Sequence, residues 1–308
     1  MNLSVQLALQ NSKGLKLKNP VMTASGTFGY GTEDNQGFDI KKLGAIVCKG
    51  TTLESREGNP QPRLAETAGG MLNSIGWENI GVDALIKEKA PVWAKWKIPV
   101  IVNIAGESVE DYARMAEKLD GVKGISGLEV NISCPNVEAG GAGFGTSPET
   151  SARVTAAVKK ATSLPVIIKL TPNTNDIAEI AAAVADAGAD AITLINTLKG
   201  MAIDIAGRKP VLGNITGGLS GPAIKPVALH MVYTVTETVD IPVIGCGGIA
   251  TASDVIEFIM AGASAIQVGT AGFNNPRAPL DILEGIQDFM EKEKVKSVTT
   301  LIGVAHPR

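Results

Sequence analysis

Eight short apolar runs, spread along almost the whole chain, constrain most strongly what this sequence can fold into. Each run is strand-sized, rich in β-branched residues and apolar at consecutive positions, which is typical of parallel strands buried on both faces. The runs are PVMTAS (20–25), AIVCKG (45–50), PVIVNI (99–104), LEVNIS (128–133), PVIIKL (165–170), AITLIN (191–196), PVIGCGG (242–248) and AIQVGT (265–270). Helical patterns separate most of them, at 108–119, 148–162, 176–187, 223–238 and 252–262.

This alternation predicts an α/β fold of the TIM (β/α)8 barrel type, formed by residues 1–308 as a single domain. An open doubly wound sheet is the alternative, but the early G-x-G-x-x-G that favours it is missing from the sequence. Residues 1–19 turn at Lys13-Gly14, and we expect them to form a β-hairpin that caps the barrel. We expect the longest stretches without regular pattern to be inserted loops at the carboxyl-terminal face: 50–75, 134–147 and 197–222.

Composition narrows the possible partners and location of the protein. The net charge of −3 gives no basic field for nucleic acid. No apolar run reaches the ~20 residues of a membrane span, and residues 1–10 do not resemble a secretion signal. The three cysteines Cys48, Cys134 and Cys246 are widely spaced and form no C-x-x-C, so we expect no metal site in this chain. This cysteine usage fits the reducing cytoplasm.

Polar residues and glycines gather where the predicted strands end, which is where TIM barrels place their chemistry. These residues are Ser25, Lys49, Asn103, Asn131, Cys134, Lys169, Asn196, Gly247, Gly248, Gly269 and Thr270. The glycines follow the last two strands, where backbone N–H groups commonly bind a phosphate. The amides suit a flat heterocycle with an imide-like edge, a description that fits both a flavin and a pyrimidine.

Cys134 follows the fourth run and precedes the glycine-rich segment 136–147, which we expect to close over a bound substrate. A nucleophilic cysteine needs a histidine within reach. His230 and His306 are the two histidines of the chain, and neither belongs to the predicted rim. A thiol pKa of ~8.5 lies close enough to neutrality for a proton acceptor. We therefore interpret Cys134 as a base, and Cys48 and Cys246 as core residues.

An ordered set of motifs resembles the dihydroorotate dehydrogenase family along nearly the whole chain. The motifs are ASGTFGYG (24–31), GNPQPRLAET (58–67), MLNSIGWENIGVD (71–83), NISCPNV (131–137), IKLTPN (168–173), NT (196–197), GGLSGPAIKP (217–226) and GCGGI (245–249). The match is closest to the catalytic subunit of the NAD-linked, two-subunit type (class 1B). The resemblance implies an FMN-binding TIM barrel that oxidises dihydroorotate to orotate in pyrimidine biosynthesis.

The resemblance also implies roles for individual residues. Cys134 matches the base that removes the C5 proton, while hydride passes from C6 to FMN. The positions that match flavin contacts are Ser25, Lys49, Gly50, Asn103, Asn131, Lys169, Ile195, Gly221, Gly247, Gly248, Gly269 and Thr270. The positions that match substrate contacts are Lys49, Asn73, Ser74, Ile75, Gly76, Trp77, Asn131, Asn196 and Thr197. Two residues depart from the family pattern: Gly50 replaces a threonine or serine, and Trp77 replaces the commoner leucine.

The electron acceptor is also implied by the resemblance. It predicts NAD⁺ as the final acceptor, reached through a partner subunit that carries FAD and a [2Fe–2S] cluster, in an assembly of two chains of each kind. One alternative is a stand-alone dihydroorotate dehydrogenase that uses fumarate. Another is a uracil or thymine reductase related to dihydropyrimidine dehydrogenase, but Lys49 beside Asn73 favours a substrate with a carboxylate. A third alternative is not an enzyme at all but a barrel that binds a phosphorylated ligand.

Overall fold

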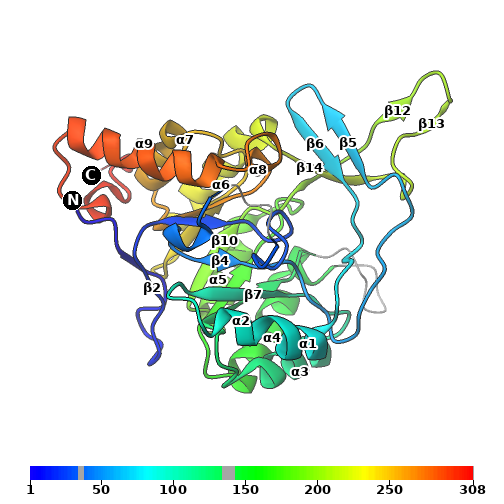
Figure 1. The fold of residues 1–308 in the computed structure, drawn as a ribbon, viewed down its shortest axis with the longest axis horizontal. Helices are drawn as coiled ribbons and strands as arrows, with labels where there is room; N and C mark the ends of the chain where they lie inside the picture. Colours follow the sequence, from blue (N-terminus) through cyan, green and yellow to red (C-terminus); the bar gives the residue numbers. More distant parts are fainter. Residues whose placement is uncertain (34–37, 134–142, 308) are drawn as a thin grey trace.

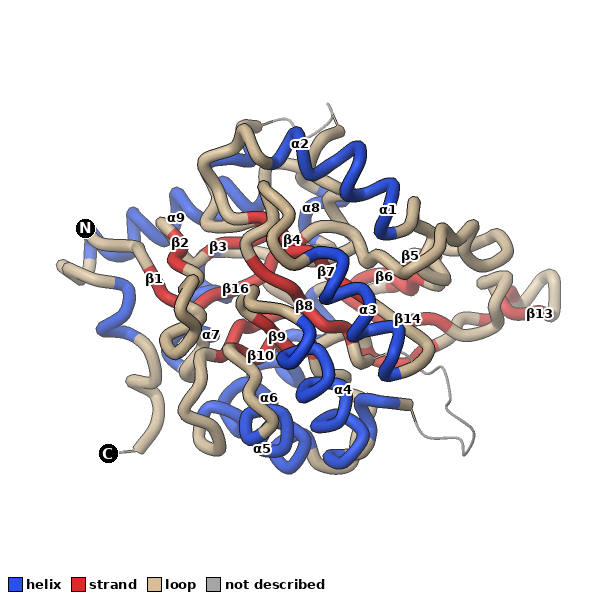
Figure 2. The backbone as a smooth tube through the Cα atoms, turned by 90° about the horizontal axis from the view of Figure 1, so that it is seen from below, coloured by secondary structure: helices blue, strands red, loops and turns tan. Residues whose placement is uncertain are grey.

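Eight parallel strands form the central sheet of the structure, a computed structural model that describes residues 1–33, 38–133 and 143–307. The strands are β3 (Val21–Thr23), β4 (Ile46–Val47), β7 (Val100–Ile104), β8 (Gly127–Asn131), β9 (Val166–Lys169), β10 (Ala191–Leu194), β15 (Val243–Cys246) and β16 (Ala265–Val268). They lie in the order β3-β16-β15-β10-β9-β8-β7-β4, at the centre of the molecule (Figure 2). Each of the eight apolar runs coincides with one of them, and only β8 begins one residue before its run.

The sheet closes on itself between its two edge strands, β3 and β4. A parallel bridge pairs Met22 with Ala45, and Gly44 donates its backbone N–H to the carbonyl of Val21 at 2.8 Å. The hydroxyl of Thr23 both accepts from the Val47 N–H and donates to the Val47 carbonyl. Because closure removes the free edges of the sheet, the predicted TIM-type barrel is confirmed.

Helices cover the outside of the barrel (Figures 1 and 2). They are α1 (Val82–Ala84) and α2 (Ala90–Trp93), joined by a π-helical turn (Leu85–Lys89), then α3 (Val109–Leu119), α4 (Pro148–Ala161), α5 (Ile177–Asp186), α6 (Lys225–Thr236), α7 (Ala252–Met260), α8 (Ala271–Asn274) and α9 (Ala278–Lys292). All five predicted helices are present. In two of them a reciprocal capping box fixes the start, with Ser108 and Asp111 before α3 and with Thr251 and Asp254 before α7. Within the described ranges, no helix is both long and apolar enough to cross a bilayer.

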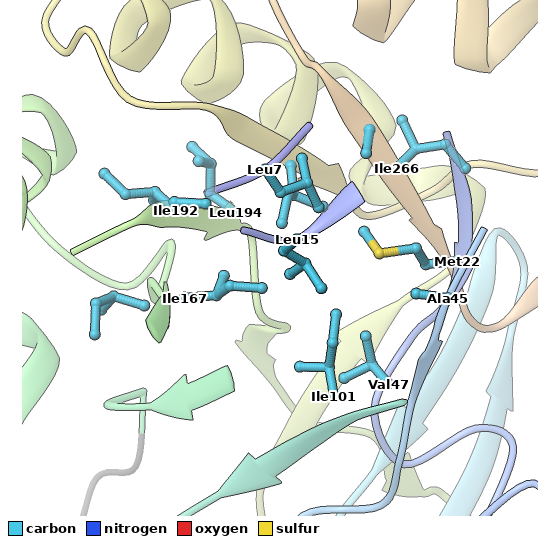
Figure 3. Close-up of a cluster of buried hydrophobic side chains, with 14 of the residues drawn as sticks. Leu7, Leu15, Met22, Ala45, Val47, Ile101, Ile167, Ile192, Leu194 and Ile266 are labelled. Carbon is cyan, nitrogen blue, oxygen red and sulfur yellow. The ribbon is translucent and has the colours of Figure 1, made fainter. Parts of the chain in front are cut away.

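The N-terminal hairpin forms an apolar floor at the amino-terminal end of the barrel. Its strands β1 (Val5–Gln6) and β2 (Lys16–Leu17) pair antiparallel, and Gly14 takes a positive φ of 60° in the predicted turn. Leu7 and Leu15 are buried and lie among side chains of the barrel strands, such as Ile101 (Figure 3). The hairpin therefore fills the bottom of the barrel with hydrocarbon.

Two of the three stretches predicted as irregular loops contain a second sheet, so that part of the prediction is wrong. This sheet has the order β11-β14-β6-β5, with strands β5 (Leu64–Thr67), β6 (Gly70–Asn73), β11 (Leu198–Gly200) and β14 (Gly217–Ser220). A short hairpin of β12 (Ile203–Asp204) and β13 (Lys209–Pro210) extends beyond it, on the side of the molecule opposite the chain termini (Figure 1). Strands β5 and β6 come from the stretch 50–75, and β11 and β14 come from 197–222. The sequence of either stretch alone does not show that β6 pairs with β14.

Candidate active site

The inward-facing side chains change from apolar to polar along the barrel axis. Residues two positions apart on a strand point to the same side of the sheet. On five strands the first member is aliphatic or glycine and the second is polar: Ile101 and Asn103, Gly127 and Glu129, Ile167 and Lys169, Ala191 and Thr193, Ala265 and Gln267. Glu129 accepts a hydrogen bond from Gln267 although three strands separate β8 from β16 in the sheet, so these side chains meet inside the barrel.

Glu129 lies at the centre of this polar layer and is completely buried. Its Oε2 accepts from the Asn103 Nδ2 at 2.7 Å, and its Oε1 accepts from the Thr193 hydroxyl at 2.9 Å and from Gln267. Each carboxylate oxygen is therefore hydrogen-bonded, which is the condition for keeping a charge in the interior of a protein.

Lys169 supplies the positive charge of the layer. Its Nζ lies 3.8 Å from the Glu129 Oε2 and makes a long hydrogen bond of 3.4 Å to the Gln267 Oε1. Burial opposes the charge of the ammonium, but the nearby Glu129 carboxylate more than offsets this effect, so the pKa of Lys169 lies above its ordinary value. The geometry and the direction of the pKa shift both favour a protonated Lys169, suited to stand beside an anion.

Asn103 presents an unused hydrogen-bond acceptor at the mouth of the barrel. Because a carboxylate can only accept, the Asn103 Nδ2 faces Glu129 and the Oδ1 faces away. This buried Oδ1 has no hydrogen-bond partner among the described residues. A Cβ at Gly50 would approach it to 3.0 Å, so the glycine leaves the oxygen more open than a larger residue would.

The amides predicted to hold a substrate are brought together from three separate segments. The Asn196 Nδ2 donates to the Asn131 Oδ1 at 3.3 Å, and Asn131 pairs in register with Lys169. Asn73, at the end of β6, donates its Nδ2 to the Gly218 carbonyl at 3.2 Å. Gly218 in turn packs against Thr197, since a Cβ there would overlap the threonine side chain. The second sheet thus carries Asn73 to the carboxyl-terminal end of the barrel.

The segment from Ser74 to Trp77 continues from Asn73 and leads to Glu78, which lies near Lys49 of the barrel. The Lys49 Nζ lies 4.0 Å from the Glu78 Oε2, and its side chain is only partly buried. Trp77 has a positive φ of 56°, and the guanidinium of Arg56 lies 5.3 Å from the centre of its ring. The Trp77 carbonyl accepts from the Asn79 Nδ2 at 2.7 Å. The carbonyl of the predicted substrate residue Ile75 accepts from the backbone N–H of Asn59 at 3.0 Å.

The predicted glycine positions lie at the same end of the barrel, after β14, β15 and β16. Gly221 and Gly248 have φ values of 96° and 75°, and a Cβ at either would approach backbone atoms to 2.7 and 2.6 Å. The Thr270 hydroxyl donates to the Ser220 hydroxyl at 2.9 Å. The other predicted members are adjacent: a Cβ at Gly247 would meet Ile195, and a Cβ at Gly269 would meet Ala24, which precedes Ser25.

The predicted base, Cys134, lies outside the described residues, as does most of the glycine-rich segment that follows it. The other two thiols are buried, as predicted. Burial raises the pKa of Cys48 to about 12 and also raises the pKa of Cys246, so both remain protonated near neutral pH. Among the described side chains, no group of three His, Cys, Asp or Glu could hold a metal ion.

Sequence reasoning missed Glu129, Thr193 and Gln267, which organise the polar layer. The signal was present, because LEVNIS and AIQVGT each place a polar side chain inside a run that otherwise reads as buried strand. A charged residue in such a run needs a partner, and Lys169 lies on the neighbouring strand, two positions beyond Ile167, which is the register partner of Glu129. Pairing the polar positions of neighbouring strands would have found the cluster.

A closed barrel with a buried ionic cluster at the carboxyl ends of its strands has the architecture of a TIM-barrel enzyme. The sequence model of the family described as "Dihydroorotate dehydrogenase" matches residues 7–290. The chain belongs to the dihydroorotate dehydrogenase family.

Curated relatives cover almost the full length of the chain. Three similar proteins are named "Dihydroorotate dehydrogenase B (NAD(+)), catalytic subunit". The protein from Pelobacter propionicus is 56% identical over 95% of this chain and 96% of its own. Those from Geotalea daltonii and Alkaliphilus oremlandii are 54% and 55% identical, each over 98% of this chain and over 97% and 98% of their own.

Proposed function

We propose that this chain oxidises dihydroorotate to orotate in pyrimidine biosynthesis, with FMN bound at the carboxyl-terminal end of its barrel. Family membership and the names of the full-length relatives support the reaction. The observation that carries the site assignment is the polar layer around Glu129 and Lys169, where a buried cation and converging amides lie at one end of a closed barrel. We infer that residues 1–308 form one FMN-binding domain.

The residues at this end fit FMN. The unpaired Asn103 Oδ1 needs a donor, and the imide N–H of a flavin is one. The Lys169 ammonium is suited to the electron-rich edge of the ring, and bare glycine backbone after β14 to β16 to the phosphate. The residues that would hold FMN are Ser25, Lys49, Gly50, Asn103, Asn131, Lys169, Ile195, Gly221, Gly247, Gly248, Gly269 and Thr270. When bound, FMN supplies the acceptor for the hydride that leaves C6 of the substrate.

The substrate would lie against the amides of the barrel mouth. Lys49, which is partly exposed, provides a cation for the dihydroorotate carboxylate. Asn131 and Asn196 offer both donors and acceptors to the imide edge of the ring. The remaining substrate contacts in this proposal are Asn73, Ser74, Ile75, Gly76, Trp77 and Thr197.

Cys134 would act as the base. Its thiolate takes the proton from C5, so that the C5–H bond breaks, an S–H bond forms, and the electron pair remains for the C5=C6 double bond. Its position in the sequence supports this role, since it directly follows Ser133, whose hydroxyl donates to the Lys169 carbonyl at 3.1 Å. The raised pKa values of Cys48 and Cys246 support it too, because neither offers a thiolate.

Electrons would leave through a second subunit and reach NAD⁺. The names of the relatives contain both "NAD(+)" and "catalytic subunit", which supports a separate electron-transfer subunit. This chain has three cysteines, one short of the four that commonly ligate an iron–sulfur cluster. We assign FAD and a [2Fe–2S] cluster to the partner, in an assembly of two chains of each kind.

An anaerobic visible spectrum of the purified chain tests the proposal. We expect the absorbance of an oxidised flavin, bleached by dihydroorotate and left unchanged by an equal concentration of dihydrouracil. A colourless protein would contradict the FMN assignment. Bleaching by dihydrouracil alone would instead identify the enzyme as a uracil or thymine reductase, because dihydrouracil has no carboxylate for Lys49 to bind.

A further inference from the structure

Glu129 is the most deeply buried charged group of the molecule's described part, and the reaction proposed above assigns it no contact with substrate or flavin. It has no exposed surface, while every recorded partner of its carboxylate is a protein side chain. Three donors from three strands converge on its two oxygens, and Lys169 on a fourth strand balances its charge. A barrel that needed only filling would be served as well by an apolar residue of this size.

The first consequence of this geometry concerns Asn103. The carboxylate accepts from the Asn103 Nδ2 at 2.7 Å, so the amide cannot turn over without placing its oxygen against a negative charge. Glu129 thus fixes which polar atom Asn103 presents to the mouth of the barrel. That atom is the Oδ1, which is buried and without a hydrogen-bond partner in the described ranges.

The second consequence concerns Lys169. Its Nζ is 3.8 Å from the Glu129 Oε2, close enough for charge balance but beyond hydrogen-bond distance. The carboxylate oxygens are already occupied by Asn103, Thr193 and Gln267. Glu129 therefore keeps the lysine protonated without occupying its N–H donors, and the donors that do not point to the Gln267 Oε1 stay available for a ligand.

We propose that Glu129 is a positioning residue for the flavin. It orients the Asn103 oxygen towards the ring, and its negative charge partly offsets the positive potential that Lys169 exerts on the reduced ring. This inference rests on the proposed function, because it requires FMN at this end of the barrel. Glu129 acts entirely through Asn103 and Lys169 and is not itself a catalytic residue.

Two substitutions separate the two parts of this role. Glu129→Gln keeps the size but removes the charge, and in either orientation its NH₂ group faces another amide donor, the Asn103 Nδ2 or the Gln267 Nε2. We expect FMN to bind about tenfold more weakly, the cost of one mispaired buried hydrogen bond, and the midpoint potential of bound FMN to become more positive. Glu129→Asp keeps the charge but shortens the reach to Asn103. For this variant we expect weaker FMN binding with a potential close to that of the wild type.

Asp190→Asn is the matched control. Asp190 is a buried carboxylate before β10, its Oδ2 lies 2.7 Å from the Lys159 Nζ, and it belongs to the opposite end of the barrel. The substitution changes charge in the same way as Glu129→Gln. We expect it to lower the thermal unfolding midpoint of the apoprotein while leaving FMN affinity and potential unchanged.

The measurements are FMN titration of the apoprotein, the midpoint potential of the bound FMN and thermal unfolding, on wild type and all three variants. A Glu129→Gln variant that is destabilised but keeps wild-type affinity and potential would overturn the proposal, because that is the behaviour of a purely structural residue. If Glu129→Gln does not accumulate, wild-type FMN affinity in Glu129→Asp overturns it equally. Failure of the proposed function is distinguishable, since the wild type itself would then bind no FMN.

Discussion

The barrel contains a lysine–carboxylate pair at each end, and the two pairs are built differently. At the amino-terminal end, the Lys159 Nζ contacts the Asp190 Oδ2 at 2.7 Å, and the same oxygen accepts from the backbone N–H of Val166 at 2.7 Å. At the carboxyl-terminal end, Lys169 and Glu129 are 3.8 Å apart and almost completely buried.

The difference shows that the pair at the amino-terminal end serves stability, whereas the pair at the carboxyl-terminal end serves ligand binding. The Lys159 pair is closed, because the ammonium hydrogen-bonds the Asp190 carboxylate, which also accepts from the backbone N–H of a neighbouring strand. The Lys169 pair is open, because the carboxylate is bonded to other side chains and the ammonium keeps donors for a ligand. A buried charge with unused donors costs stability, and such a cost is typical of functional sites.

The largest expected effect comes from breaking the open pair. Lys169→Met leaves Glu129 as an uncompensated buried charge, so we expect the free energy of unfolding to fall by about 3–5 kcal/mol. We also expect FMN to be lost. The matched change Lys159→Met should cost less, about 1 kcal/mol, because Lys159 is one quarter exposed and the Asp190 Oδ2 keeps its hydrogen bonds from the Val166 N–H and the Asn11 Nδ2. Urea unfolding and the FMN content of both purified variants check this, and equal effects of the two substitutions would contradict the comparison.

Cys134→Ala is expected to give the next largest effect, on the rate alone. Losing a general base should slow flavin reduction by dihydroorotate by about 10²- to 10⁴-fold, while bound FMN is retained. Anaerobic stopped-flow absorbance over a range of pH values measures this rate. Bleaching at near wild-type rates would remove Cys134 from the mechanism.

Leu7→Ala tests the opposite end of the barrel. This side chain is fully buried in the floor, so its truncation should leave a cavity and lower the free energy of unfolding by about 3 kcal/mol. We expect FMN affinity and the rate of flavin reduction to stay unchanged in the fraction that folds. A large change in either, at unchanged stability, would show that the two ends are not separate.

The smallest expected effect is the pH dependence contributed by Asp120, which lies on the amino-terminal side after α3. Hydrogen bonds from Ser163 and Thr162 lower its pKa to about 2. Because this pKa lies below that of the unfolded chain, the stabilisation is present above about pH 4 and is lost as the pH falls towards about 2. Its side chain is about one third exposed, so we expect less than about 1 kcal/mol. Acid unfolding of Asp120→Asn should show a correspondingly flatter profile, with flavin reduction at neutral pH unaffected.

The sequence predicted the barrel well because its signal is local. A parallel strand that is buried on both faces is apolar at consecutive positions, and residues 165–168 show this without knowledge of their neighbours. Helix starts are equally local, as the Ser108 capping box illustrates. The second sheet was missed because β6 pairs with β14, about 145 residues away, and strands this short carry little pattern of their own.

The candidate site was predicted only for residues at strand ends. We identified Lys169, Asn103 and the glycines because TIM barrels place their active sites at the carboxyl-terminal ends of the strands. Glu129 and Gln267 lie inside strands and were read as part of apolar runs, since their role depends on contacts across the barrel interior. Cys134 was inferred from the sequence and stays a prediction, because it lies outside the described residues.

A crystal structure of the chain with FMN and orotate tests the division between the two ends most directly. Our account predicts the isoalloxazine ring within hydrogen-bond distance of the Lys169 Nζ and the Asn103 Oδ1, with orotate against Asn131 and Asn196. A flavin bound at the hairpin end, or a ring that touches neither Lys169 nor Asn103, would contradict it.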